Sequence, residues 1–223
     1  MPVIVSFVSQ KGGVGKSTLA RALLAVAGRI MRARVADLDP QQGSVAEWER
    51  IRERTKIGGA CDVVAYTSAE QAIEASKGVE LLIIDAPARS SPETLTIAQR
   101  SHLVVQPTGA SADDLRPATL LFHELVKAGI PRERLTMAIC RILSEKEEAQ
   151  TRLSIEQAGY DALAGAIPER SAYREAQDRG QAITETKFAK LNERADALME
   201  ALLRKVTDEV KRLQRSKQAA RSK

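Results

Sequence analysis

The sequence predicts an α/β fold, a mostly parallel twisted sheet with helices on both of its faces. Short apolar runs alternate along the chain with longer amphipathic stretches, as in strand–helix–strand units. The run Val79–Asp85 contains four consecutive large apolar residues, as expected of a strand covered on both sides. Apolar residues make up 43% of the 223 residues and charged residues 28%, a composition that argues against wholesale disorder.

The same patterns give the order of the elements. Apolar runs predict strands at Val3–Val8, Arg34–Leu38, Asp62–Tyr66, Val79–Asp85, Leu103–Gln106, Leu135–Cys140 and near 162–167. Helical periodicity predicts helices at Lys16–Ile30, Val45–Glu53, Ala69–Ser76, Glu93–Arg100, Ala112–Ala128, Ser144–Ala158, Ala172–Arg179 and from about Glu185 to Leu213. We expect residues 1–215 to form one domain and residues 216–223 to be a basic, disordered tail.

Composition also excludes several classes of protein. Cys61 and Cys140 lie far apart without a CxxC motif, which argues against a zinc ribbon or a disulfide framework. No apolar run approaches the roughly 18 residues of a spanning helix, and the N-terminus does not resemble a secretion signal. We therefore expect a cytoplasmic protein.

The positive charge is concentrated near the C-terminus. The net charge is +5, and eight basic against two acidic residues between Arg204 and Lys223 give that segment +6. A basic segment of this kind favours a polyanionic partner.

A glycine-rich loop follows the first predicted strand and opens a helix. Its sequence, SQKGGVGKST, covers residues 9–18. Glycines let the backbone approach phosphates closely, and successive N–H groups together with the helix N-terminus attract anions. Lys16 is expected to reach the β- and γ-phosphates, and the Ser17 hydroxyl to bind Mg²⁺. The predicted site for ATP and Mg²⁺ comprises Gly12, Gly13, Val14, Gly15, Lys16, Ser17 and Thr18.

The loop departs from the standard GxxxxGK(S/T) pattern. Gln10 stands at the first glycine position, and a second lysine, Lys11, lies five residues before Lys16. KGGVGKST resembles the deviant phosphate loop (deviant Walker A) of the ParA/MinD family of P-loop ATPases. DLDPQ at 37–41, LLIIDAP at 81–87, IPER at 167–170 and the later residues Ala176, Gly180, Ile183 and Glu185 resemble further family stretches. The resemblance spans about residues 2–190.

The resemblance implies that ATP is hydrolysed by a homodimer. Lys11 would reach the phosphates of the partner's site, and Asp39 would orient or activate the attacking water. Lys11, Lys16 and Asp39 would thus form the catalytic set, and Ser17, Asp39 and Asp85 the metal site. A buried carboxylate such as Asp85 is costly without a cation, which also favours a metal partner. Pro168 and Glu169 are expected to form the wall of the adenine pocket.

The resemblance is to small plasmid-partition proteins without an N-terminal helix-turn-helix domain. It implies weak intrinsic ATPase activity, binding of nonspecific DNA by the ATP dimer, a centromere-binding adaptor protein as partner, and association with the nucleoid. Neutralisation of phosphates by the basic segment gives a physical reason for DNA binding. The candidate contacts are Lys205, Lys211, Arg212 and Arg215.

Two alternatives remain open. An ATPase that positions another cargo would have the same chemistry. The apolar stripe from Leu191 to Leu213 could instead lie on a membrane, although a helix packed on the sheet would show the same stripe, and no stable membrane association is expected. A metabolic P-loop enzyme or iron–sulfur scaffold is disfavoured, because the two cysteines do not form a cluster-binding pair.

Overall fold

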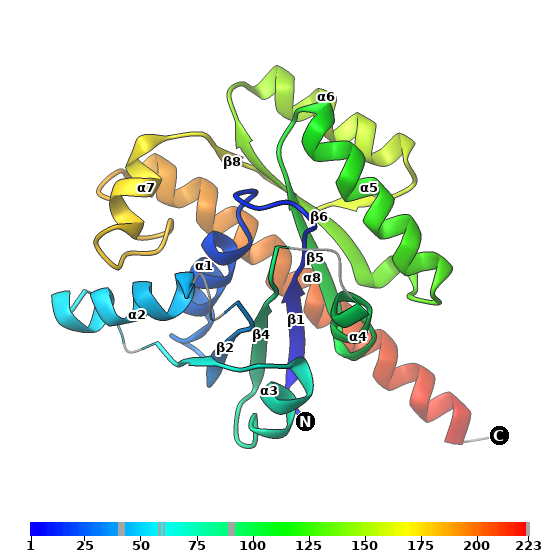
Figure 1. Ribbon diagram of the computed structural model, residues 1–223. Helices are drawn as coiled ribbons and strands as arrows, with labels where there is room; N and C mark the ends of the chain where they lie inside the picture. The colour runs from blue at the N-terminus through cyan, green and yellow to red at the C-terminus, as the bar shows by residue number, and fades with distance from the viewer. Residues whose placement is uncertain (40–42, 58, 60, 89–91, 222–223) are drawn as a thin grey trace.

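A twisted parallel sheet forms the centre of the molecule (Figure 1). The computed structural model describes residues 1–39, 43–57, 59, 61–88 and 92–221. Over these residues the sheet has eight strands in the order β3-β2-β4-β1-β5-β6-β7, with β8 paired to β6. The strands are β1 (Val3–Phe7), β2 (Ala33–Asp37), β3 (Val63–Ala65), β4 (Leu81–Asp85), β5 (Leu103–Thr108), β6 (Leu135–Ile142), β7 (Asp161–Ala162) and β8 (Ile167–Pro168).

Helices cover both faces of this sheet. They are α1 (Lys16–Ala27), α2 (Ser44–Thr55), α3 (Ala69–Glu74), α4 (Pro92–Arg100), α5 (Ala112–Lys127), α6 (Glu145–Gln157), α7 (Ser171–Gln177) and α8 (Ala189–Arg221). Helices α1, α2 and α8 contribute to one apolar core, and α3, α4, α5 and α6 to the other. In β4, Leu81 and Ile83 enter the first core, while Leu82 and Ile84 enter the second. This alternation explains the uninterrupted apolar run in the sequence, because both faces of the strand are buried.

The α/β fold is therefore as predicted, with two differences near the C-terminal end. The single short strand expected near residues 162–167 is two separate strands, β7 and β8, which pair with different parts of β6. Helix α8 starts at Ala189 rather than Glu185 and continues to Arg221, past the expected end at Leu213.

The physical reasons for the new bounds of α8 are local. Glu185 folds back to accept a hydrogen bond from the Ala182 N–H at 2.9 Å, so the chain turns there instead of entering the helix. Residues 214–221 contain neither glycine nor proline and are rich in good helix formers. Residues 216–221, expected to be disordered, are thus the end of α8, and residues 222–223 lie outside the described part of the chain.

Candidate nucleotide-binding site

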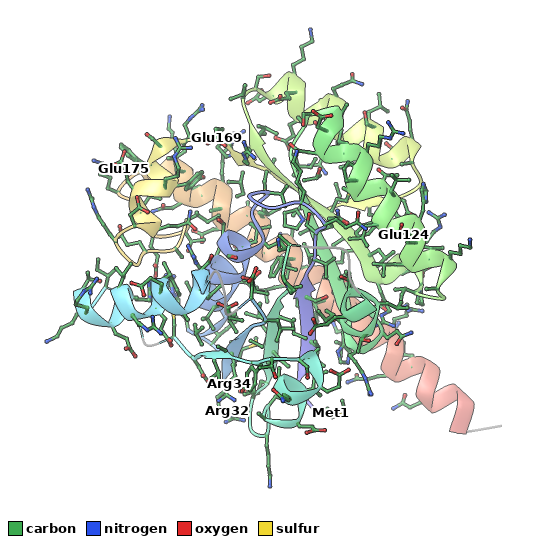
Figure 2. The ribbon with its side chains drawn as sticks, in the orientation of Figure 1. Met1, Arg32, Arg34, Glu124, Glu169 and Glu175 are labelled. Carbon is green, nitrogen blue, oxygen red and sulfur yellow. The ribbon has the colours of Figure 1, made fainter. Side chains whose placement is uncertain are left out.

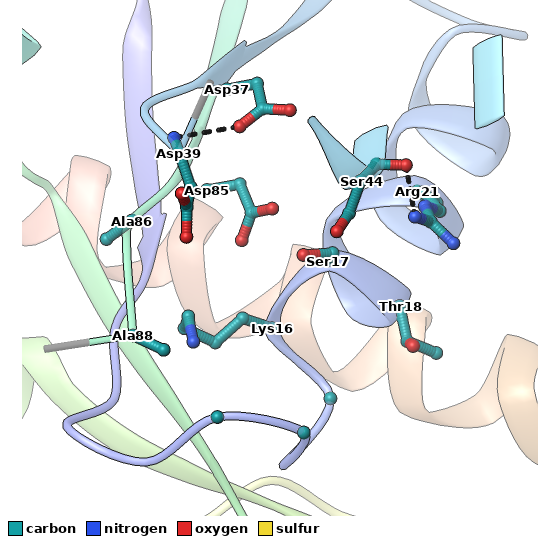
Figure 3. A pocket seen from close by; sticks show the side chains of 13 residues that line it. Lys16, Ser17, Thr18, Arg21, Asp37, Asp39, Ser44, Asp85, Ala86 and Ala88 are labelled. Carbon is teal, nitrogen blue, oxygen red and sulfur yellow. Dashed lines mark hydrogen bonds between the residues drawn. The ribbon is translucent and has the colours of Figure 1, made fainter. Parts of the chain in front are cut away.

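The glycine-rich loop connects β1 to α1. Gly13 and Gly15 have φ angles of 74° and 115°, in the left-handed region that favours glycine, and Gly15 is the N-cap of α1. The side chain of Val14 is buried, and Val14 is not among the described residues that line the adjoining cavity. In Figure 3 the Lys16 side chain lies within the curve of the loop. The loop thus has the shape that close approach to phosphate requires.

A cavity of about 230 Å³ lies between this loop and the carboxyl ends of β2 and β4. The parallel register pairs Asp37 of β2 with Asp85 of β4, so both carboxylates reach the same end of the sheet. Asp37, Asp39 and Asp85 stand on one side of the cavity, facing Lys16 and Ser17 (Figure 3). The lining therefore combines carboxylates with an ammonium group and a hydroxyl.

Asp85 is the most strongly perturbed carboxylate in this cavity. Burial raises its pKa to about 7; a hydrogen bond with Ser17 and the charge of Lys16 oppose this rise, and Asp37 adds to it. Within the described part of the chain, its Oδ1 atom has no hydrogen-bond partner. A buried carboxylate oxygen left without a donor is unfavourable, so the site fits a bound cation.

The residues present fit Mg²⁺ in particular. Among the described residues, no group of three or more His, Cys, Asp or Glu side chains could hold a metal. Mg²⁺ keeps several waters and needs only one or two protein ligands when phosphates supply the others. Ser17 and Asp85 match that requirement.

Lys16 is nearly buried, with 8% of its surface exposed. Burial lowers its pKa, and the charges of Asp85 and Asp39 partly counter that effect. A desolvated ammonium group gains most from an anionic ligand. The predicted phosphate-binding role therefore agrees with its environment.

The two aspartates at the carboxyl end of β2, Asp37 and Asp39, have different surroundings. Asp37 accepts hydrogen bonds from the backbone N–H groups of Asp39 (3.0 Å) and Val45 (3.3 Å), and so holds the start of α2 against the sheet. Asp39 lines the cavity, and its predicted roles in orienting water and in the metal site both stay predictions. Pro40 and Gln41 of the DLDPQ stretch lie outside the described residues.

Lys11 points out of the loop toward the N-terminus of α5. Its ammonium group lies 2.5 Å from the Asp114 carboxylate and 3.4 Å from the Asp113 carbonyl oxygen. Lys11 is not among the described residues that line the cavity. Contact with a partner's phosphate would require release from Asp114, so the predicted role across a dimer stays a prediction.

A second cavity of about 370 Å³ adjoins the first and shares Gly13, Gly15 and Thr18 with it. Pro168 and Glu169 line this cavity, where the base of a nucleotide bound to the loop would extend. Glu169, labelled beside α7 in Figure 2, is held by Arg141 (3.1 Å) and Arg174 (2.5 Å). Their predicted contact with adenine stays a prediction.

Sequence reasoning missed several residues that line these cavities. Arg141 adopts a φ of 60°, unusual for a residue other than glycine, and Tyr173 and Gln177 come from α7. Arg21 of α1 also lines the phosphate cavity. The available signal for Arg21 was a lone charge within the apolar stretch LARALLAVA.

The four candidate DNA contacts lie in the distal half of α8, part of which extends beyond the sheet (Figure 1). Lys205 forms an ion pair with Asp161 at 2.9 Å, and Arg212 binds Glu209 through two nitrogens at 2.6 and 2.8 Å. Lys211 and Arg215 are exposed. Intramolecular pairing thus reduces the positive charge that Lys205 and Arg212 offer to an external ligand.

None of the described helices is long and apolar enough to traverse a bilayer.

A strand, a glycine-rich loop, a helix bearing a buried lysine and a facing carboxylate together define a P-loop nucleotide-binding protein. Residues 5–183 match the CobQ/CobB/MinD/ParA nucleotide binding domain, and the chain belongs to that family. The ParA/MinD resemblance of the sequence is thereby confirmed.

Individual relatives cover nearly the whole chain. Maintenance of carboxysome distribution protein A from Gloeobacter kilaueensis is 29% identical over 219 residues, or 95% of each chain. Apo McdA from Cyanothece superposes with a TM-score of 0.71 at 15% identity, covering 91% of this chain and all of that one. A putative plasmid partition protein from Borrelia burgdorferi bound to AMPPNP gives 0.70 at 17% identity, covering 92% and 100%. The two structures confirm the predicted fold.

Proposed function

We propose that the protein is a dimerising ATPase that binds nonspecific DNA in its ATP state and segregates plasmid or chromosomal DNA with a centromere-binding adaptor. One observation carries the ATPase part: the buried Oδ1 of Asp85 has no hydrogen-bond partner among the described residues, and Asp85 lines a cavity of about 230 Å³ together with Lys16 and Ser17. This arrangement suits Mg²⁺ bound to a nucleoside triphosphate.

The chemistry assigns a role to each residue. Ser17 and Asp85 would hold Mg²⁺, which neutralises charge on the phosphates. Lys16 would bind the β- and γ-phosphates, and Asp39 would orient a water for attack on the γ-phosphorus. The bond from that phosphorus to the bridging oxygen breaks, which yields ADP and phosphate. Lys11 from a second copy would add positive charge beside the transferring phosphoryl group, where negative charge accumulates.

Sedimentation with a non-hydrolysable ATP analogue, together with phosphate release, tests this scheme. We expect the wild type to form dimers only with the analogue and Lys11→Ala to remain monomeric. Asp39→Ala should dimerise on ATP while its turnover falls at least about tenfold. Lys127→Ala, an exposed lysine on α5, is the control. Dimerisation of Lys11→Ala with wild-type affinity would exclude the cross-subunit role.

DNA binding is proposed through the exposed basic residues of α8. Replacing Lys211 and Arg215 with glutamine should weaken binding and lower the slope of log affinity against log salt by about two. Arg32→Gln serves as the control, because Arg32 is an exposed arginine that directly precedes β2 and does not lie on α8. A mobility shift across several salt concentrations measures both quantities, and an unchanged slope would move the DNA surface elsewhere.

A second candidate cargo is a protein assembly. The 29% identical relative is named for carboxysome distribution, which favours an ATPase that positions a cargo other than DNA. To distinguish the two cargoes, the ATPase rate is measured with DNA and with a candidate adaptor, separately and together. The adaptor that stimulates the rate identifies the cargo. Sedimentation with anionic liposomes tests the membrane alternative, for which we expect no ATP-dependent binding.

A further inference from the structure

Arg21 brings a positive charge into the wall of the phosphate cavity. It lies on α1 one helical turn after Ser17, between the fully buried residues Ala20 and Ala22. Burial lowers its pKa, and the charges of Asp85, Asp37 and Asp178 oppose that shift. A charge in this position is costly unless its contacts repay the desolvation.

The contacts of Arg21 join α1 to two other helices. Its Nη2 donates to the carbonyl oxygen of Ser44, the first residue of α2 (Figure 3). Its Nη1 donates to Oε1 of Gln177, the last residue of α7, at 3.0 Å. The planar guanidinium can hold two acceptors in fixed directions, which an ammonium group cannot.

The same oxygen of Gln177 also accepts a hydrogen bond from the Thr18 hydroxyl at 3.1 Å. Thr18 lines both cavities, so a nucleotide that spans them competes with Gln177 for this hydroxyl. Arg21 and Gln177 therefore connect a group that touches the nucleotide to the start of α2. We call the set Thr18, Gln177, Arg21 and Ser44 the Arg21 bridge.

The start of α2 is in turn bonded to Asp39. The Gly43 N–H donates to the Asp39 carbonyl oxygen at 2.8 Å, and Asp37 accepts from the N–H groups of both Asp39 and Val45. Displacement of Ser44 therefore shifts the backbone that carries Asp39. Among the described residues, Nε of Arg21 is buried without a partner, so its arrangement is not the most favourable one available.

We propose that Arg21 is a positioning residue for hydrolysis: through the Arg21 bridge it links the contact between Thr18 and the nucleotide to the placement of Asp39. The proposal rests on the proposed ATPase function. Arg21 also packs on Trp48, whose ring centre lies 5.9 Å from the guanidinium carbon, and a purely structural role would rest on this contact alone.

Trp48 supplies a readout that separates the two roles. It is the only tryptophan of the chain, it is fully buried on α2, and Arg21 and Arg52 both lie over its ring. If the Arg21 bridge responds to nucleotide, the emission of Trp48 changes when ATP and Mg²⁺ are added. A static packing role gives no such change.

The experiment compares Arg21→Gln, Arg21→Lys and Gln177→Leu with the wild type. Fluorescent ATP gives the affinity, single turnover gives the hydrolysis rate, and intrinsic emission gives the response of Trp48. We expect ATP affinity within about threefold of wild type, hydrolysis at least about tenfold slower, and no emission response in all three variants. Arg50→Gln on the exposed side of α2 is the matched control and should behave as wild type.

Two results would overturn the proposal: hydrolysis and emission response both unchanged in Arg21→Gln, or ATP affinity lost in proportion to the rate. Gln177→Leu leaves Arg21 in place, so it decides the question if the Arg21 variants do not fold. A wild type that binds ATP without hydrolysing it contradicts the proposed function. In that case the emission response of wild type against Gln177→Leu still tests the bridge.

Discussion

Two regions of the molecule bury charged side chains, and they differ in how those charges are satisfied. Arg52 of α2 and Glu185, in the turn before α8, form a bidentate ion pair with distances of 2.7 and 2.8 Å. Burial raises the pKa of Glu185, but hydrogen bonds from Arg52 and the Ala182 N–H outweigh that effect and lower it. In the phosphate cavity, by contrast, burial dominates and the pKa of Asp85 rises to about 7.

The difference separates a structural site from a binding site. Around the ion pair, Arg52 also donates to the carbonyl oxygens of Gly59 and Gly180, so its donors are used within the chain. Gly180 has a φ of 76°, and a Cβ atom there would lie 2.5 Å from the backbone nitrogen of Arg52. The family-like residues Gly180 and Glu185 thus have a packing explanation. Asp85, by contrast, keeps an oxygen that has no hydrogen-bond partner in the described part of the chain.

The largest expected effect on stability comes from breaking the ion pair between Arg52 and Glu185. Glu185→Ala leaves the Arg52 guanidinium buried without its partner, so we expect the free energy of unfolding to fall by about 3–5 kcal/mol. Urea denaturation measures it, with Glu193→Ala, an exposed glutamate of α8, as the control. A loss below about 1 kcal/mol would place this pair among weak surface bridges.

Removing the charge of Lys16 from the phosphate cavity should weaken ATP binding and leave the stability of the fold nearly unchanged. Lys16→Ala deletes a desolvated ammonium group, so we expect ATP affinity to fall at least about 100-fold while the free energy of unfolding changes by less than about 1 kcal/mol. Calorimetric titration with ATP and Mg²⁺ measures the first quantity and denaturation the second. ATP affinity equal to that of wild type would contradict the assignment of the phosphate loop.

The smallest expected effect is a pH-dependent change in melting temperature, which tests whether the buried carboxylate of Asp85 destabilises the empty site. The folded-state pKa of Asp85 lies above its unfolded value, so its contribution to stability is present at low pH and is lost as pH rises through about 7. Without nucleotide and metal, Asp85→Asn should therefore melt at least about 2–4 °C above wild type near pH 8, and the difference should largely disappear near pH 4, close to the ordinary pKa of an aspartate. Adding Mg²⁺ and ATP should reverse the order near pH 8. Equal melting temperatures at both pH values would mean that Asp85 carries no penalty.

The sequence predicts those features that depend on residues close to one another along the chain. The phosphate loop and the central strand depend on neighbouring residues, and both are as expected. The buried carboxylate at Asp85 was also predictable, because it ends a run that is covered on both faces. These features need no knowledge of distant partners.

Contacts between distant residues could not be predicted in the same way. Lys11 meets Asp114, and Arg21 meets Gln177, only because the fold brings α5 and α7 to the loop. Likewise, Lys205 belongs to the basic segment of the sequence, and the fold places Asp161 beside it. A charge pattern along the sequence does not record such partners, since they lie at least 44 residues away.

Helix α8 has a mechanical consequence. Its 33 residues run without interruption over about 50 Å, and among its described side chains those buried in the apolar core are Ala195, Leu198, Met199, Leu202 and Val206. A continuous helix packed on the core along one part of its length holds its outer end at a set distance from that core.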